Sequence, residues 1–243
     1  MHIIKLDAID STNSFLRQLV GKNTIDDFTV VTAKFQSAGK GQMGAFWESD
    51  YEKNLMFSVY TKRCKINVNQ SFYISMGVAL AIRKALEEHF LPQLKIKWPN
   101  DILSQSKKIC GILIENVIKN NAVTASIIGV GLNVNQLYFP NLPNASSLKG
   151  IMGCDFNLEE LLNAVLTHLG WYINRLKTND FNSIKAEYER HLFRKDKPST
   201  FKDKSGNLFP GYIKSVNASG DLLVMLEDNA LKAFSLKEIT LMY

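Results

Sequence analysis

"KFQSAGKGQMGAFW", residues 34–47, contains a literal Gly-x-Gly-x-x-Gly pattern, the spelling with which Rossmann domains cradle a pyrophosphate. In that fold a strand precedes the glycines and a helix follows at once, because the pyrophosphate lies against the helix N-terminus. The β-branched residues at 28–35 predict the strand. The segment after the loop, "AFWESDYEKN", has no helical periodicity and leads into a second strand at 55–62. The loop is therefore predicted to join two strands, which excludes the Rossmann fold.

Two further features of this region exclude the common nucleotide-binding loops. About 20 residues beyond the loop, where a Rossmann domain holds the ribose with an acidic residue, the sequence reads "YTKRCK". The Gly-Lys-Ser/Thr ending of a Walker loop is also missing from the sequence. The glycines are instead expected to let the backbone approach a ligand, with Lys40 supplying a positive charge beside it.

Length, charge and cysteine content set the broad class of protein. The 243 residues suffice for one large domain, or one domain with a small second module. The longest apolar stretch, 72–82, is shorter than the roughly 20 residues of a membrane span, and the N-terminus has no signal-peptide pattern. Three cysteines without a Cys-x-x-Cys pair are typical of a reducing compartment. The net charge of +6 comes without a dense basic run, so we expect a cytoplasmic protein with no membrane or DNA partner.

The order of predicted elements indicates the fold class. Apolar residues at helical spacing predict helices at 10–20, 71–90, 157–177 and 181–193. Strands are expected at 2–6, 28–35 and 55–62 and in four runs between 95 and 134, with a hairpin turn at 119–121. Asn157, with Glu160 three residues later, predicts a capping box at the start of the third helix.

The texture of the sequence changes near Arg194, beyond which short strands are punctuated by glycines at a spacing that suggests a small β-barrel. We therefore predict an α+β protein. Residues 1–193 are expected to form a mixed β-sheet with helices packed on it. Residues 194–243 are expected to form a small all-β module, of a size that can still fold alone.

The stretch "DSTN" places Ser11, Thr12 and Asn13 at a predicted helix start. Taken alone, these side chains are best explained as N-caps, because Ser, Thr and Asn are the preferred capping residues. A polar cluster at this position would serve equally as one wall of a binding site, so its interpretation depends on the other motifs.

Three more stretches favour a ligand-binding site. In "IKWPND" a turn explains Asn100 and Asp101, but not a strand that ends on Lys97 and a tryptophan. "KKICGILIENV" sets Lys108 before an apolar strand, and "GVGLNVN" puts two glycines inside another, which indicates close approach of a second group. Together the lysines, the polar helix start and the glycine-lined strands predict a site for a small carboxylic acid beside a nucleotide.

These stretches occur in the order seen in biotin–protein ligases, which the chain resembles over about residues 6–135. "KWPND" followed by "KKICGILIE" is the most specific part, and "GYIKSVNASGDLLV" resembles the SH3-like β-barrel of that family. The resemblance implies a class II synthetase-like catalytic core over 1–193 and the barrel over 194–243. Because the chain begins within a few residues of the core, it resembles the monofunctional members without an N-terminal DNA-binding domain.

The resemblance implies a two-step ligase reaction with ATP and biotin as substrates. The biotin carboxylate attacks the α-phosphate of ATP, which gives biotinyl-5′-AMP and pyrophosphate. A lysine of a biotin carboxyl carrier protein then attacks the mixed anhydride, which gives an amide and AMP. Mg²⁺ on the phosphates would stabilise the leaving group. The chain is expected to be a monomer or a homodimer.

The same resemblance carries residue roles onto this sequence. Lys108 would bridge carboxyl and phosphate oxygens, Lys40 would lie over them, and Asp101 would accept the proton of the acceptor lysine; these three are the expected catalytic residues. The residues expected to bind biotin or ATP are Ser11, Thr12, Asn13, Gln36, Gly39, Lys40, Gly41, Gln42, Trp47, Lys97, Asn100, Lys108, Gly111, Gly131 and Asn133.

The glycine loop departs from the family pattern, which is commonly Gly-Arg-Gly-Arg-x-Gly-Arg. Here Lys40, Gln42 and Ala45 occupy the arginine positions. Lys40 keeps a charge without the two-pronged geometry of arginine, and the other two positions lose the charge. We therefore expect the adenylate to be held less firmly than in arginine-rich members.

Three alternatives stay open at this level. A lipoate– or octanoate–protein ligase would share the chemistry, a non-catalytic binding protein would use the C-terminal module, and a repressor would need a DNA-binding domain. Cys110 is interpreted as a buried structural thiol, because it lies in an apolar strand without a base beside it, although related acyltransferases include members with a cysteine nucleophile.

Overall fold

The computed structural model describes residues 2–22, 24–140 and 142–243, without the side chains of residues 63–65. Seven strands form one mixed sheet in the order β1-β2-β3-β7-β6-β5-β4. β1 and β2 run parallel, and the other neighbouring pairs are antiparallel. The bounds are β1 (His2–Ile9), β2 (Thr29–Gln36), β3 (Leu55–Asn67), β4 (Lys95–Lys97), β5 (Asp101–Ser104), β6 (Lys107–Lys119) and β7 (Ala122–Leu132).

The glycine loop joins two antiparallel strands, as predicted. β2 ends at Gln36, β3 begins at Leu55, and the connection contains a short 3₁₀ turn, Gln42–Gly44, and an isolated antiparallel bridge between Lys40 and Phe46. The hairpin expected at 119–121 is also confirmed, because β6 ends at Lys119 and β7 begins at Ala122.

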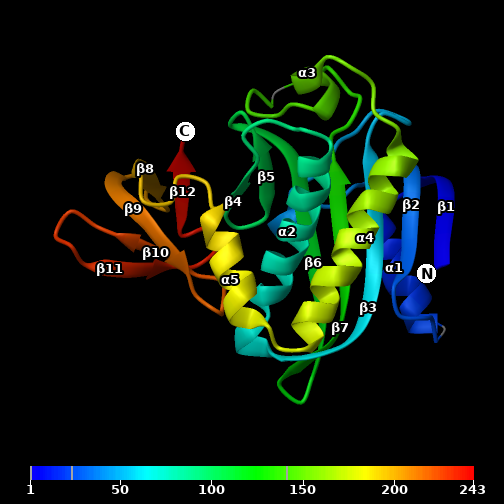
Figure 1. Cartoon of the computed structure of the whole chain (residues 1–243), viewed down its shortest axis with the longest axis horizontal. Coiled ribbons are helices and arrows are strands. Elements are labelled where there is room, and N and C mark those ends of the chain that lie inside the picture. Colours follow the sequence, from blue (N-terminus) through cyan, green and yellow to red (C-terminus); the bar gives the residue numbers. More distant parts are fainter. Residues whose placement is uncertain (1, 23, 141) are drawn as a thin grey trace.

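Helices cover both faces of the sheet (Figure 1). α2 and α4 pack together on one face over the larger core, and α1 packs on the opposite face over a smaller cluster that contains Leu16, Val31 and Ile127. The predicted helices are therefore present, and a short helix, α3, was not predicted. The bounds are α1 (Thr12–Lys22), α2 (Phe72–Glu88), α3 (Leu148–Met152), α4 (Leu158–Lys177) and α5 (Phe181–Arg190).

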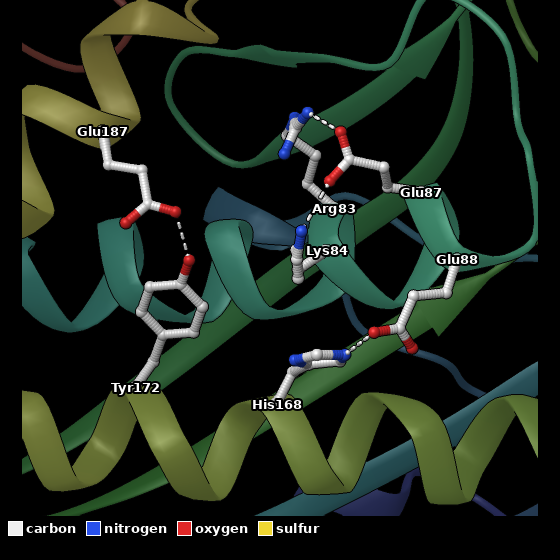
Figure 2. A network of polar contacts seen from close by, with 7 residues as sticks. All are labelled: Arg83, Lys84, Glu87, Glu88, His168, Tyr172 and Glu187. Carbon is white, nitrogen blue, oxygen red and sulfur yellow. Dashed lines mark hydrogen bonds and ion pairs between the residues drawn. The ribbon is translucent and has the colours of Figure 1, made fainter.

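Polar contacts hold the outer helices to one another (Figure 2). His168 Nε2 of α4 lies 2.9 Å from Glu88 Oε1 of α2, and the hydroxyl of Tyr172, also on α4, donates to Glu187 of α5. At the start of α4 the Asn157 side chain accepts hydrogen bonds from two backbone N–H groups, as the capping pattern predicts.

A second sheet follows the helices. Its five strands are antiparallel, in the order β11-β10-β9-β8-β12, so the short strands predicted beyond Arg194 form a second sheet. The indole N–H of Trp98, in the main sheet's β4–β5 turn, donates to the Gly220 carbonyl at 2.8 Å. The bounds are β8 (Pro198–Asp203), β9 (Leu208–Val216), β10 (Leu222–Met225), β11 (Leu231–Phe234) and β12 (Ile239–Met242).

The outer strand of the main sheet, β4, is paired by the segment that leads to the second sheet. Ile96 N donates to the His191 carbonyl at 2.9 Å, and Phe193 N donates to the Ile96 carbonyl at 2.8 Å. The backbone of residues 191–193 therefore continues the ladder beyond β4.

Within the described residues, no helix is long and apolar enough to cross a bilayer.

Candidate active site

A cavity of about 230 Å³ lies between the glycine loop, the N-terminus of α1 and the face of the sheet that α1 covers. It brings together most of the residues predicted from sequence. The predicted residues on its wall are Ser11, Thr12, Asn13, Gln36, Lys40, Gly41, Gln42, Trp47, Asn100, Asp101, Lys108, Gly111 and Gly131. The other lining residues are Ala45, Phe46, Ile112, Leu113, Gly129 and Val130.

Three of the predicted binding residues lie outside this lining. Asn133 is buried, and its side-chain amide donates to the Ser146 carbonyl at 2.9 Å, so it holds a loop together. Gly39 is buried within the loop, where an added Cβ would come within 2.4 Å of the Trp47 carbonyl oxygen. Lys97 lines a neighbouring cavity against the second sheet.

The glycines predicted on β6 and β7 form a floor for an aromatic ring. Gly111 and Gly131 are cross-strand partners. A Cβ on Gly131 would come within 2.4 Å of the Trp47 indole, and one on Gly111 within 2.9 Å. Since Cβ atoms do not approach other heavy atoms so closely, only glycine at these two positions lets the indole lie flat on the strands.

The charged end of the cavity is organised around Asp101. Its Oδ1 lies 2.7 Å from Lys108 Nζ, and its Oδ2 lies 3.9 Å from Lys97 Nζ. Burial lowers the pKa of the Lys97 ammonium below its ordinary value, while the charge of Asp101 acts in the opposite direction. Lys108 Nζ also lies 5.7 Å from the centre of a Trp47 ring, within the range of a cation–π contact. The Lys108 cation is thus held by a carboxylate on one side and an indole on the other.

Lys40 approaches from the glycine loop. Its side chain is exposed and its Nζ donates to Ser14 Oγ of α1 at 2.8 Å. The loop itself closes through the Trp47 N–H, which donates to the Gly39 carbonyl at 2.9 Å. The cation predicted from sequence is therefore an exposed side chain on the cavity wall, bonded to α1.

The neutral end of the cavity is a set of buried polar side chains. Thr12 donates from its backbone N–H to Gln36 Oε1 at 2.8 Å, and its hydroxyl oxygen lies 3.1 Å from the same atom. Ser58 Oγ, fully buried on β3, lies 2.7 Å from Thr12 Oγ1 and 2.6 Å from Asn13 Oδ1. The Thr12 and Asn13 side chains thus bond to the sheet, so they are more than helix caps.

Sequence reasoning missed two residues of this arrangement, Ser58 and Glu115. Glu115 lies on the same face of β6 as Gly111 and accepts a hydrogen bond from Asn13 Nδ2 at 3.1 Å. The signal available in the sequence was a carboxylate inside an otherwise apolar strand, "GILIENV". The partner of that carboxylate could not be read without the strand register.

Cys110 is fully buried, and its burial raises the pKa of the thiol above the ordinary value. It belongs to the large core on the face that carries α2, whereas the neighbouring Gly111 faces the cavity. A buried thiol with a raised pKa is a poor nucleophile. This position agrees with the structural interpretation of Cys110.

The cavity offers no protein cage for a metal ion. Among the residues with described positions, no three His, Cys, Asp or Glu side chains are grouped closely enough to ligate one. The acidic side chain on the cavity wall, Asp101, is already paired with Lys108. Mg²⁺ in phosphate-transfer sites is held largely through water and substrate phosphates. Mg²⁺ therefore stays an expectation of the resemblance.

A model of the biotin/lipoate A/B protein ligase family matches residues 6–133, more than half of the chain. The chain belongs to this family. The matched residues of this biotin/lipoate ligase family member include every residue that lines the cavity, from Ser11 to Gly131.

Individual family members resemble the chain over most of its length. The bifunctional ligase/repressor BirA of Bacillus subtilis is 29% identical over 240 residues, which cover 96% of this chain and 72% of that protein. The biotin–[acetyl-CoA-carboxylase] ligase of Paracoccus denitrificans is 26% identical over 229 residues, which cover 90% and 92% of the two chains. A solved structure of the biotin protein ligase from Aquifex aeolicus in complex with biotin and ATP superposes with a TM-score of 0.82 and 25% identity, over 99% of this chain and 98% of that one.

Proposed function

We propose that the protein is a biotin–protein ligase that makes biotinyl-5′-AMP from biotin and ATP and transfers the biotinyl group to a lysine of a biotin carboxyl carrier protein. The observation that carries the proposal is the polarity of one cavity. Buried neutral hydrogen-bonding groups lie at one end, and a lysine held by a carboxylate lies at the other. Such a cavity suits a neutral ring that bears a carboxylate, placed beside a phosphate.

In the first step the ring of biotin binds at Ser11, Thr12, Asn13 and Gln36, and its carboxylate lies near Lys108. A carboxylate oxygen attacks the α-phosphorus of ATP, and the bond to pyrophosphate breaks. Two anions must meet for this reaction, so a fixed cation offsets their repulsion and stabilises the charge that develops on the phosphate oxygens. Asp101 keeps the Lys108 ammonium in place.

In the second step the amine of the acceptor lysine attacks the carbonyl carbon of the anhydride, and the bond to AMP breaks. The amine must lose a proton as the amide forms. Asp101, on the cavity wall, is the proposed acceptor of that proton. Lys40 on the cavity wall and Trp47 on the glycine floor flank the nucleotide side of the site, with Asn100.

The remaining expectations are proposed on the same basis. Residues 1–193 are the catalytic domain, and residues 194–243, whose five strands form one antiparallel sheet, are the SH3-like barrel of the family. The partner is a carrier protein of a biotin-dependent carboxylase, as the name of the Paracoccus relative suggests. A cytoplasmic location and a monomeric or dimeric state stay predictions from the sequence.

The proposed function predicts ATP–pyrophosphate exchange that depends on biotin. Purified protein is incubated with ATP, Mg²⁺, labelled pyrophosphate and one acid at a time: biotin, lipoate or octanoate. Exchange is expected with biotin alone, because the buried polar end of the cavity matches a ureido ring. Samples without acid give the background rate. Exchange with lipoate instead would assign the lipoate ligase activity, and no exchange with any acid would refute the adenylating function.

A second prediction concerns the glycine loop. Gln42 and Ala45 both line the cavity, so arginines at these positions would reach the bound adenylate. We expect the Gln42→Arg variant to lengthen the half-life of the enzyme-bound adenylate by about tenfold, since a charge-assisted hydrogen bond to phosphate contributes roughly 1.5–3 kcal/mol. Release of labelled adenylate through a gel-filtration column measures the half-life. A Lys119→Arg variant, with the substitution at the far end of β6, is the control. An unchanged half-life in Gln42→Arg would show that a positive charge at this loop position does not help to retain the adenylate.

A further inference from the structure

Hydrogen-bond direction at the neutral end of the cavity follows from one amide. Asn13 has its Oδ1 2.6 Å from Ser58 Oγ and its Nδ2 3.1 Å from Glu115 Oε2. An ionised carboxylate only accepts hydrogen bonds, so the amide must turn its NH₂ group toward Glu115 and its oxygen toward Ser58. Gly129 makes this position available, because a Cβ there would come within 2.4 Å of Asn13 Oδ1.

The orientation of Asn13 decides what Ser58 can do. An amide oxygen only accepts, so the single hydroxyl hydrogen of Ser58 is directed to Asn13 Oδ1. Ser58 is fully buried, so no water competes for that hydrogen. The other close neighbour of Ser58 Oγ is the hydroxyl of Thr12, at 2.7 Å. Because Ser58 has no second hydrogen, it cannot donate to Thr12 and can only accept from it.

The Thr12 hydroxyl has two acceptors within the protein, Ser58 Oγ at 2.7 Å and Gln36 Oε1 at 3.1 Å. Its one hydrogen is used by either of them. Thr12 is 4% exposed and lines the cavity, so its hydroxyl can offer a ligand only a lone pair. At the Thr12 hydroxyl the cavity wall therefore accepts a hydrogen bond from a ligand and does not donate one.

We propose that Glu115 is a positioning residue that makes the Thr12 hydroxyl an acceptor for a ring N–H of the bound acid. The inference rests on the proposed function, in which that group is one of the two ureido N–H groups of biotin. Glu115 does not line the cavity and acts through Asn13 and Ser58. On its outer side Glu115 is paired with the exposed Arg17.

The test measures ligand preference as well as affinity. Biotin and its cyclic carbamate analogue, in which a ring oxygen replaces one ureido N–H, are titrated by calorimetry into wild-type protein and the Glu115→Ala and Glu115→Gln variants. In wild type the carbamate should bind at least tenfold more weakly, since its ring oxygen would face a lone pair. In Glu115→Ala, Asn13 is free to turn, the Thr12 hydrogen is released, and the preference should fall below threefold. Glu115→Gln, whose side chain can both donate and accept, should give an intermediate preference.

The Arg17→Ala variant is the matched control. It removes the surface ion pair of Glu115 and leaves the carboxylate beside Asn13, so its preference for biotin should stay within twofold of wild type. A merely structural role of Glu115 would weaken both ligands equally and leave the preference unchanged, and that result would overturn the inference, as would an equal loss of preference in Arg17→Ala. If Glu115→Ala does not fold, Glu115→Gln decides. Wild-type protein that binds no biotin would instead overturn the proposed function itself.

Discussion

Lys108→Ala is expected to lower biotin-dependent ATP–pyrophosphate exchange by about 10²-fold or more. The Lys108 ammonium is held 2.7 Å from Asp101 Oδ1 and over the Trp47 indole, at the end of the cavity where carboxylate and phosphate must meet. A preorganised charge at that place stabilises the transition state, and removing one such donor costs rates on this scale. The loss should fall on kcat, with the biotin KM changed much less, because the ring is bound at the other end of the cavity.

The neighbouring lysine provides the control for this experiment. Lys107 is exposed, and its ammonium donates to the Pro143 carbonyl outside the cavity. Lys107→Ala should therefore exchange pyrophosphate at a rate within twofold of wild type. A loss of less than threefold in Lys108→Ala would show Lys108 to be a surface lysine without a part in the chemistry.

Gly131→Ala is expected to lower adenylate formation on the order of 10²-fold, because a displacement of about 1 Å in an active site can cost that much. The new Cβ would stand 2.4 Å from the Trp47 indole and force the ring off the strands. Since the ring also contacts Lys108, its displacement would disturb the cation as well. The rate of biotinyl-5′-AMP formation in a single turnover measures the effect.

Two variants separate this clash from a general cost of adding a methyl group. Gly21→Ala, in α1, meets no heavy atom within 4 Å and should form adenylate like the wild type. The double variant Gly131→Ala with Trp47→Ala removes the clash and should recover the melting temperature lost in Gly131→Ala. If the single variant melts and turns over normally, the indole does not rest on the glycine floor in solution.

Much of the site could be predicted from local sequence because its residues carry visible signals. The glycine loop was assigned between two strands from the absence of helical periodicity at 45–54, and β2 and β3 confirm it. Lys108 and Gly111 were found because a lysine and a glycine stand out in an apolar strand. Such features can be recognised from a few consecutive residues, without knowledge of which strands pair.

The rest of the site depends on long-range register. Ser58 and Glu115 come from β3 and β6, which are separated in the sheet by β7, and they meet only through α1 residues on one face. In the sequence Ser58 is an ordinary serine within a predicted strand, and its burial cannot be read from its neighbours. Conversely, Asn133 lies in a glycine-bearing motif of the family, yet its amide serves a neighbouring backbone. Pairing across strands cannot be derived from spacing along one strand.

The pairing of β4 with residues 191–193 has a consequence for the behaviour of the protein at high concentration. An uncovered outer strand offers its backbone groups to any passing chain, which is how sheets aggregate or exchange strands. Here the backbone groups of Ile96 are occupied by the chain's own continuation. The opposite edge of the sheet, β1, carries the charged side chains of Lys5 and Asp7, which disfavour pairing with a foreign strand. The segment that joins the two sheets thus occupies the backbone groups of Ile96 with which a foreign strand would otherwise pair.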